Sequence, residues 1–205
     1  MTPANLLTQW ARLLIESVKE HTRPGLAPRI ILTDLSPRIR LWDSLCAARP
    51  DELTFIPRSV DATAVPEEFG RGRPRLILNA FHHFSPPLAR AVLTDAHRHA
   101  SGIFIAENFG RNPLGTLPCG IYGMPAAFAN PVLTSQRRLV KALLTYLVPA
   151  IPLAVTWDGL VSSLRVYTRE ELLEMTRDLQ GFEWHDGVFH YSPMGRGRFF
   201  YGVRR

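Results

Sequence analysis

Short apolar runs alternate with helical segments along this chain, and that alternation restricts its fold more than any other feature. The apolar runs lie at residues 29–33, 75–79 and 102–106, and each is too short for a helix. Segments with helical spacing follow at residues 39–48 and 87–100. Near-continuous apolar strands separated by helices are typical of a parallel sheet covered on both faces. The sequence therefore predicts an α/β fold.

Further elements are expected on either side of this region. Residues 5–19 carry apolar side chains at helical spacing, which predicts an N-terminal amphipathic helix. Residues 53–60 predict a second strand, ending at Asp61. After Glu107 we expect a Gly- and Pro-rich loop that continues to about Pro131.

The C-terminal part predicts two helices and a hairpin. A buried helix is expected from Ser135 to Leu147, continuing into an extended segment because of its prolines. Thr168 and Glu171 have the spacing of a capping box, which predicts the start of the next helix. Residues 182–191 and 198–203 predict two strands that form a C-terminal hairpin.

Length and composition favour a single domain. The chain has 205 residues, of which 46% are hydrophobic and 20% charged, as in an average globular domain. We divide this domain, residues 1–205, into an N-terminal helix, the strands that would hold a cofactor, a substrate-side insertion, and a C-terminal helix with its hairpin. These parts span residues 1–20, 28–107, 108–168 and 169–205, respectively.

Charge and cysteine content exclude several classes of protein. The net charge of +6 comes from scattered arginines without the interleaved aromatics of a nucleic-acid reader, so nucleic-acid binding is disfavoured. Cys46 and Cys119 lie too far apart for a metal motif and are expected to be reduced thiols. No apolar run reaches the roughly 20 residues of a transmembrane helix, and no secretory signal is recognised. We expect a cytoplasmic protein, with contact to a membrane surface left open.

Polar residues follow the predicted strands at their carboxyl ends, where open α/β sheets bind ligands. These residues are Asp34, Asp61, Asn79 and Glu107. Asp34 is placed either to accept the hydroxyl hydrogens of a ribose or to cap the next helix. Asp61, followed by the small Ala62, is placed either to accept an adenine amino group or to form an Asx-turn.

Two neighbouring histidines lie directly after the strand that ends at Asn79. Adjacent side chains on a loop point apart, and no further histidine has ligand spacing, so we expect no metal site. The unperturbed pKa of an imidazole lies near neutrality, which suits His83 as a general base. A structural, hydrogen-bonded role for His82 and His83 is the alternative.

A second group of functional side-chain types occurs between residues 157 and 167. Trp157, Asp158, Arg165 and Tyr167 combine aromatic, acidic and basic groups around a glycine. One interpretation is contact with the substrate, to which Glu107 would also contribute. The other is a structural turn that contains a buried pair of Asp158 and Arg165.

Taken in order, these segments resemble the class I S-adenosylmethionine-dependent methyltransferases, in particular a bacterial subgroup. The resemblance rests on four segments and extends from about residue 28 to the C-terminus. They are Ile31-Leu32-Thr33-Asp34, Val60-Asp61-Ala62-Thr63, Leu78-Asn79-Ala80-Phe81-His82-His83-Phe84, and the stretch from Trp157-Asp158-Gly159 to Tyr167-Thr168. The resemblance implies a Rossmann-like sheet, S-adenosylmethionine as cofactor and a small molecule as methyl acceptor.

The resemblance also implies roles for individual residues. Asp34 would hold the ribose of the cofactor, and Asp61 with Ala62 its adenine. Asn79 and Phe81 would line its methionine end. His83 and His82 would act in catalysis.

The chain departs from the family pattern before Asp34. Members of the family begin with a strand and a Gly-rich loop, and no such loop precedes Asp34. Either the true start is missing, or the protein is a degenerate, non-catalytic relative that serves as an interaction module. That first strand lies centrally in the family sheet, so its absence predicts exposed strand edges and self-association.

Overall fold

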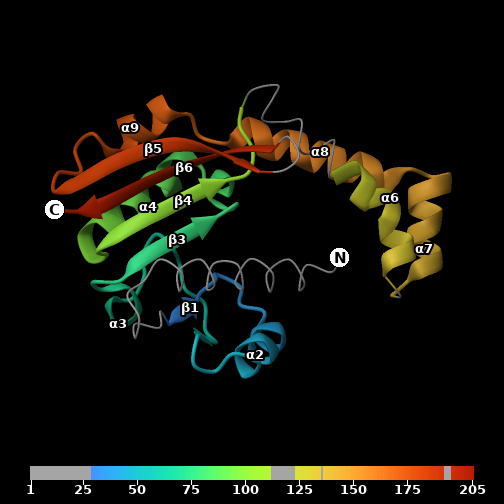
Figure 1. Ribbon diagram of the computed structural model, residues 1–205, viewed down its shortest axis with the longest axis horizontal. Helices are drawn as coiled ribbons and strands as arrows, with labels where there is room; N and C mark the ends of the chain where they lie inside the picture. The colour runs from blue at the N-terminus through green and yellow to red at the C-terminus, as the bar shows by residue number, and fades with distance from the viewer. Residues whose placement is uncertain (1–28, 112–122, 135, 192–194) are drawn as a thin grey trace. The chain divides into compact units, whose positions relative to one another are not determined.

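A computed structural model describes residues 29–111, 123–134, 136–191 and 195–205 (Figure 1). The chain divides into two compact units, Met1–Ala62 and Thr63–Arg205, which are described separately. The helix predicted for residues 5–19 and Cys119 lie outside the described residues.

The described part of the first unit is a small two-layer structure. Strands β1 (Ile30–Leu32) and β2 (Leu53–Phe55) pair in parallel, with Ile30 opposite Leu53. Helix α2 (Ile39–Ala47) connects them, and its buried Leu45 packs against Leu53. The predicted strand and helix positions are confirmed here. The second strand is shorter than predicted, because it ends before Ser59 and Val60.

The second unit contains a four-stranded mixed sheet. Its strands are β3 (Pro74–Leu78), β4 (Gly102–Glu107), β5 (Phe182–Tyr191) and β6 (Gly195–Arg204), in the order β3-β4-β6-β5. β3 and β4 are parallel, whereas β6 is antiparallel to both β4 and β5. The predicted C-terminal hairpin is confirmed. The sheet is not wholly parallel, because the hairpin reverses the chain direction at its edge.

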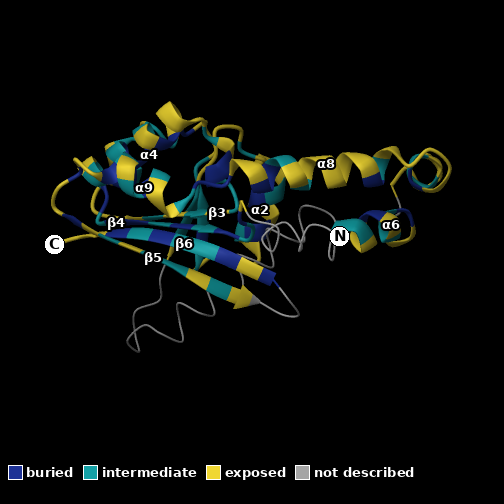
Figure 2. Cartoon of the chain, turned by 90° about the horizontal axis from the view of Figure 1, so that it is seen from above, coloured by how far each residue is buried: buried dark blue, intermediate teal, exposed yellow. Residues whose placement is uncertain are grey.

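Helices cover one face of this sheet (Figure 2). On that face Ile103, Ile105 and Phe200 are buried beneath the apolar side of α4 (Pro86–His99). Helix α9 (Arg169–Thr176) packs beside α4, and the short α3 (Glu67–Gly70) contacts α4 as well. Among the described residues of this unit, no helix covers the opposite face, so coverage of both faces stays a prediction.

Helix α9 begins as the sequence predicts. The Thr168 side chain accepts a hydrogen bond from the Glu171 backbone, and the Glu171 carboxylate accepts one from the Thr168 backbone. This reciprocal pair satisfies two backbone donors at the start of the helix. The capping-box prediction is confirmed.

The insertion before α9 differs from the prediction. Helix α6 (Met124–Leu133) occupies part of the expected loop, and α7 (Arg138–Ala142) continues into a π-helical turn, η3 (Leu143–Leu147). The predicted extended segment is instead helix α8 (Ala150–Arg165). Its early proline is tolerated because the first turn of a helix needs no backbone donor there.

Two interpretations of this insertion are therefore wrong. The helix expected to be buried exposes Leu139 to 86%, and the expected turn around Asp158 is part of a continuous helix. Asp158 and Arg165 are both exposed, so they do not form a buried pair.

The described strands do not join into one sheet. Among the described strands, β1 pairs with β2 and β3 pairs with β4, and no hydrogen-bonded pairing joins the two sheets. The α/β fold with a sheet flanked by helices and the C-terminal hairpin are confirmed. The missing first strand and self-association through open strand edges stay predictions.

Candidate active site

Asn79 brings together the carboxyl ends of β3 and β4. Its backbone has a positive φ of 51°, which asparagine tolerates better than most residues. Its N–H donates to the Ala106 carbonyl at 2.8 Å, and its side-chain oxygen accepts from the Asn108 N–H at 2.7 Å. Asn79 thereby fixes the start of the loop that carries the two histidines.

His82 and Glu107 form a buried pair beside this loop. His82 lies on the short 3-10 helix η1 (Phe81–His83), and Glu107 is the last residue of β4. The His82 backbone N–H contacts Glu107 Oε1 at 3.0 Å, and His82 Nδ1 contacts Oε2 at 2.8 Å. A carboxylate only accepts hydrogen bonds, so this geometry places the Nδ1 proton toward Glu107 and leaves Nε2 as the nitrogen available to accept.

His83 lies next to this pair and is exposed. Its ring centroid is 4.2 Å from that of His82, and Arg165 Nη2 donates to the His83 carbonyl at 3.0 Å. Burial of part of the ring lowers the pKa of His83, and the neighbouring His82 and Arg165 lower it further. Glu107 and Asp158 act in the opposite direction but more weakly. His83 is therefore neutral near pH 7 and able to accept a proton.

Tyr167 joins the end of α8 to the same loop. Its hydroxyl donates to the Phe84 carbonyl at 2.8 Å, and its ring centroid is 5.6 Å from that of Phe81. Burial raises the pKa of Tyr167, so it remains a neutral hydrogen-bond donor. Arg165 and Tyr167 are thus brought to the histidine loop, although about eighty residues of sequence separate them from it.

The remaining expected contact residues lie differently. Phe81 is almost fully buried, at 1% exposure, between Phe84 and Tyr167. Trp157 is exposed and lies two turns before the end of α8. Their assignments to cofactor and substrate remain predictions.

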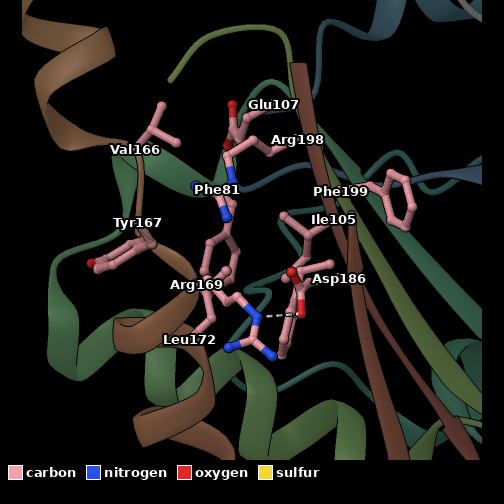
Figure 3. Close-up of a pocket in the computed structure, with 11 residues that line it drawn as sticks. Phe81, Ile105, Glu107, Val166, Tyr167, Arg169, Leu172, Asp186, Arg198 and Phe199 are labelled. Carbon is pink, nitrogen blue, oxygen red and sulfur yellow. Dashed lines mark hydrogen bonds and ion pairs between the residues drawn. The ribbon is translucent and has the colours of Figure 1, made fainter. Parts of the chain in front are cut away.

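A small pocket adjoins Glu107 on the helix-covered face of the sheet (Figure 3). Its cavity volume of about 20 Å³ corresponds to about one water molecule. Arg198 lies directly opposite Glu107 across β4 and β6, and Arg169 Nε donates to Asp186 Oδ1 at 2.8 Å. These charged groups line the pocket together with apolar side chains from the sheet and α9.

Sequence reasoning did not identify Arg169, Asp186 or Arg198 as site residues. From the sequence alone, Arg198 is one of the scattered arginines that carry the net charge. The register that brings Arg198 opposite Glu107 depends on how the hairpin pairs with β4. Strand pairing between distant segments leaves no local signal in a single sequence.

Asp34 and Asp61 belong to the first unit and are both exposed. The Val60 N–H donates to the Asp34 carbonyl at 2.9 Å, so the segments that carry the two acids lie side by side. Asp34 Oδ1 accepts from the Ser36 N–H at 2.7 Å, which is the geometry of an Asx-turn. Asp34 Oδ2 has no hydrogen bond among the described residues, so one carboxylate oxygen is available to a ligand hydroxyl.

Metal binding finds no support in the described residues. Within them, no three side chains of His, Cys, Asp or Glu lie close enough together to hold a metal ion. The buried imidazole of His82 is instead paired with a single carboxylate.

Comparison with known proteins gives structural matches only. No family model matches the sequence, and neither does any curated protein. A putative Zn-dependent alcohol dehydrogenase from Rhodobacter sphaeroides is 16% identical with a TM-score of 0.52, over 95% of this chain and 81% of that one. The methyltransferase domain of the bacterial protein CtHen1 is 10% identical with a TM-score of 0.52, over 97% of this chain and 84% of that one.

The pyocyanin biosynthetic protein PhzM is also similar, at 10% identity and a TM-score of 0.50. The match covers 87% of this chain, which spans only 44% of the length of PhzM. At such identities the likeness shows the fold alone. That fold is the Rossmann-like α/β fold that methyltransferase domains also have.

Proposed function

We propose that this protein is an S-adenosylmethionine-dependent methyltransferase that acts on a small molecule. The observation that carries the proposal is the arrangement of His82, His83 and Glu107 at the carboxyl ends of β3 and β4. This is the edge where α/β sheets bind ligands, and the fold match with a methyltransferase domain agrees with it. The motifs in residues 78–84 and 157–168 meet at this edge through Arg165 and Tyr167.

In this proposal the first unit holds the ribose and adenine of the cofactor. Asp34 follows β1 directly, is exposed, and keeps one carboxylate oxygen available while the other closes the Asx-turn. In this proposal Asp34 binds the ribose, Asp61 with Ala62 binds the adenine, and Asn79 and Phe81 border the methionine end. S-adenosylmethionine supplies a methyl group on a sulfonium, which is already a strong electrophile.

The protein's own part in the reaction is then positioning and proton removal. Held close to the methyl group, an acceptor gains most of its rate from orientation. His83 is neutral near pH 7 because its pKa is lowered, so it would remove the acceptor's proton. Glu107 acts as a positioning residue, since it fixes the ring of His82 against His83. Trp157, Asp158, Arg165 and Tyr167 would border the acceptor.

A non-catalytic relative is the second candidate. Two observations favour it: Asp34 already uses Oδ1 in a local turn, and the pocket beside Glu107 has room for only about one water. Such a protein would retain the sheet for interaction with a partner and bind the cofactor weakly.

Methyl transfer distinguishes the two candidates. The full chain is incubated with S-adenosylmethionine carrying a labelled methyl group and with a pool of small-molecule acceptors. Formation of S-adenosylhomocysteine that depends on the pool supports the enzyme. His83→Ala should abolish most of that turnover, whereas the exposed His190→Ala should leave it unchanged. Absence of labelled product under all conditions supports the non-catalytic relative.

A further inference from the structure

The helical arm, which we define as α6, α7, η3 and α8, exposes an unusual amount of apolar surface. Fourteen of the twenty-one exposed large apolar residues of the described structure lie between Phe128 and Leu164. Leu147 is exposed to 74% and Trp157 to 69%. Monomeric soluble proteins seldom expose large contiguous apolar patches, and such patches mark sites of interaction.

The arm's helices pack on one another but leave this surface open. α6 contacts α7 and α8, and η3 contacts both α7 and α8. Among the arm's described elements, α8 contacts the histidine loop at η1, and Arg165 at its C-terminal end donates to the His83 carbonyl. Figure 2 shows α8 with mostly exposed residues along its length. The arm is therefore not a core element of the second unit.

The charges of the arm before Asp158 on α8 are all basic. The sequence from Asn108 to Trp157 contains no Asp or Glu, whereas it contains four basic residues. Arg137, Arg138 and Lys141 lie together at α7, beside the exposed Leu139. A basic group next to apolar and aromatic side chains is the composition of segments that bind at the surface of an anionic bilayer.

The helix geometry favours the bilayer surface over its interior. Among the described residues no single helix is long and apolar enough to span a bilayer. Arg138–Leu147 and Ala150–Arg165 have the required length and composition only as a pair, and they are bent by 76° relative to each other. A second copy of the chain fits less well, because it would bring the basic groups at α7 together, and the arm's one acidic residue, Asp158, lies on α8 instead.

We propose that the helical arm binds the surface of an anionic lipid bilayer, with Leu139, Leu147 and Trp157 in the acyl boundary and Arg137, Arg138 and Lys141 at the headgroups. This inference does not depend on the methyltransferase proposal. A protein held in this way would act at the membrane surface.

The test is flotation of the full chain with phosphatidylcholine vesicles that contain or lack 30% phosphatidylglycerol. We expect binding to the anionic vesicles, little binding to the neutral ones, and release in 0.5 M NaCl, where charges are strongly screened. The triple variant Arg137→Gln, Arg138→Gln, Lys141→Gln should bind on the order of 100-fold more weakly. Leu139→Glu should also weaken binding at least tenfold, as expected for a charge at the acyl boundary.

Matched variants outside the arm test whether binding depends on the position of the substituted residues or only on the net charge of the chain. Arg38→Gln, Arg40→Gln, Arg73→Gln removes the same charge from exposed positions, and Leu35→Glu makes the same change at another exposed leucine. Both controls should float like the unchanged chain. Equal loss in the control triple variant would overturn the proposal.

Self-association is measured in parallel by light scattering without lipid. A dimer that Leu139→Glu dissociates, together with no binding to anionic vesicles, would show that a second copy covers the arm and would overturn the proposal. Binding that is equal on neutral and anionic vesicles would overturn it as well. A blue shift of tryptophan emission on anionic vesicles, lost in Trp157→Phe, would support it.

Discussion

His82 Nδ1 lies 2.8 Å from Glu107 Oε2 in a site where both side chains are at least nine-tenths buried. Glu107 also accepts the backbone N–H of His82 at 3.0 Å. One carboxylate therefore fixes both the position and the ring orientation of the histidine. The pair connects the end of β4 to the loop after β3, and the proposed chemistry depends on it.

Removal of this carboxylate should destabilise the fold. Glu107→Ala leaves two buried donors of His82 unpaired, each at a cost of about 1 to 3 kcal/mol. Urea denaturation of Glu107→Ala should show a corresponding loss in the free energy of unfolding. Glu107→Gln keeps one side-chain acceptor and should therefore lose less of that free energy. Asp158→Ala, at an exposed acid, serves as the control. A loss below about 0.5 kcal/mol in Glu107→Ala would contradict the pairing.

Turnover should depend on the protonation of His83. Because its pKa lies below the ordinary 6.5, we expect kcat to stay constant from pH 8 to about 6.5 and to fall at lower pH. The free energy of unfolding should also fall at low pH. The folded protein takes up this proton less readily than the unfolded chain, so acidification below about pH 6.5 favours unfolding.

The pH–rate profile and the His83→Ala variant check this role together. His83→Ala should reduce kcat more than it reduces cofactor affinity, since a proton acceptor acts in the transition state. His82→Ala should act mainly on binding. Equal losses of binding in both variants, without a separate effect on kcat, would make the two histidines structural residues.

The capping box of α9 should contribute measurably to stability. Thr168→Ala removes the side-chain acceptor of the Glu171 N–H and should cost about 1 kcal/mol. Thr168→Ser retains that acceptor and should restore most of the loss. Thermal or urea unfolding measures the stability of both variants. A Thr168→Ala protein with an unchanged free energy of unfolding would show that the cap does not stabilise the fold.

The elements that the sequence predicts well are those with strong local signals. The strand at Ile30, the helix from Pro86 to His99 and the capping box at Thr168 each follow from spacing and propensity within a few residues. Local patterns thus predict elements of both units.

The helical arm could not be predicted in the same way. Its apolar residues suggested burial, because in a single sequence an apolar helix that packs inside looks the same as one that remains exposed. The prolines before and within the start of α8 suggested an extended segment, although proline is also compatible with a first helical turn. Burial is decided by tertiary packing, which the local pattern does not contain.

The sequence predicts only part of the candidate site. His82, His83 and Glu107 were identified from their positions at strand ends, which the order of strands and helices supplies. Their pairing, the contacts of Arg165 and Tyr167, and the position of Arg198 opposite Glu107 depend on long-range geometry. The roles of Asp34 and Asp61 stay predictions.

Calorimetric titration of the chain with S-adenosylhomocysteine tests the central claim most directly. Saturable binding at one site is expected, and Asp34→Ala should weaken it at least tenfold through lost charge-assisted hydrogen bonds. Asp34→Asn retains an acceptor for the Ser36 N–H but lacks the charge, so it should also bind weakly if Asp34 contacts the ribose. Asp51→Ala, at an exposed acid on the same unit, should bind normally. No binding by the unchanged chain, or equal affinity in a folded Asp34→Ala variant, would contradict the assignment of this protein as a methyltransferase that holds its cofactor at Asp34.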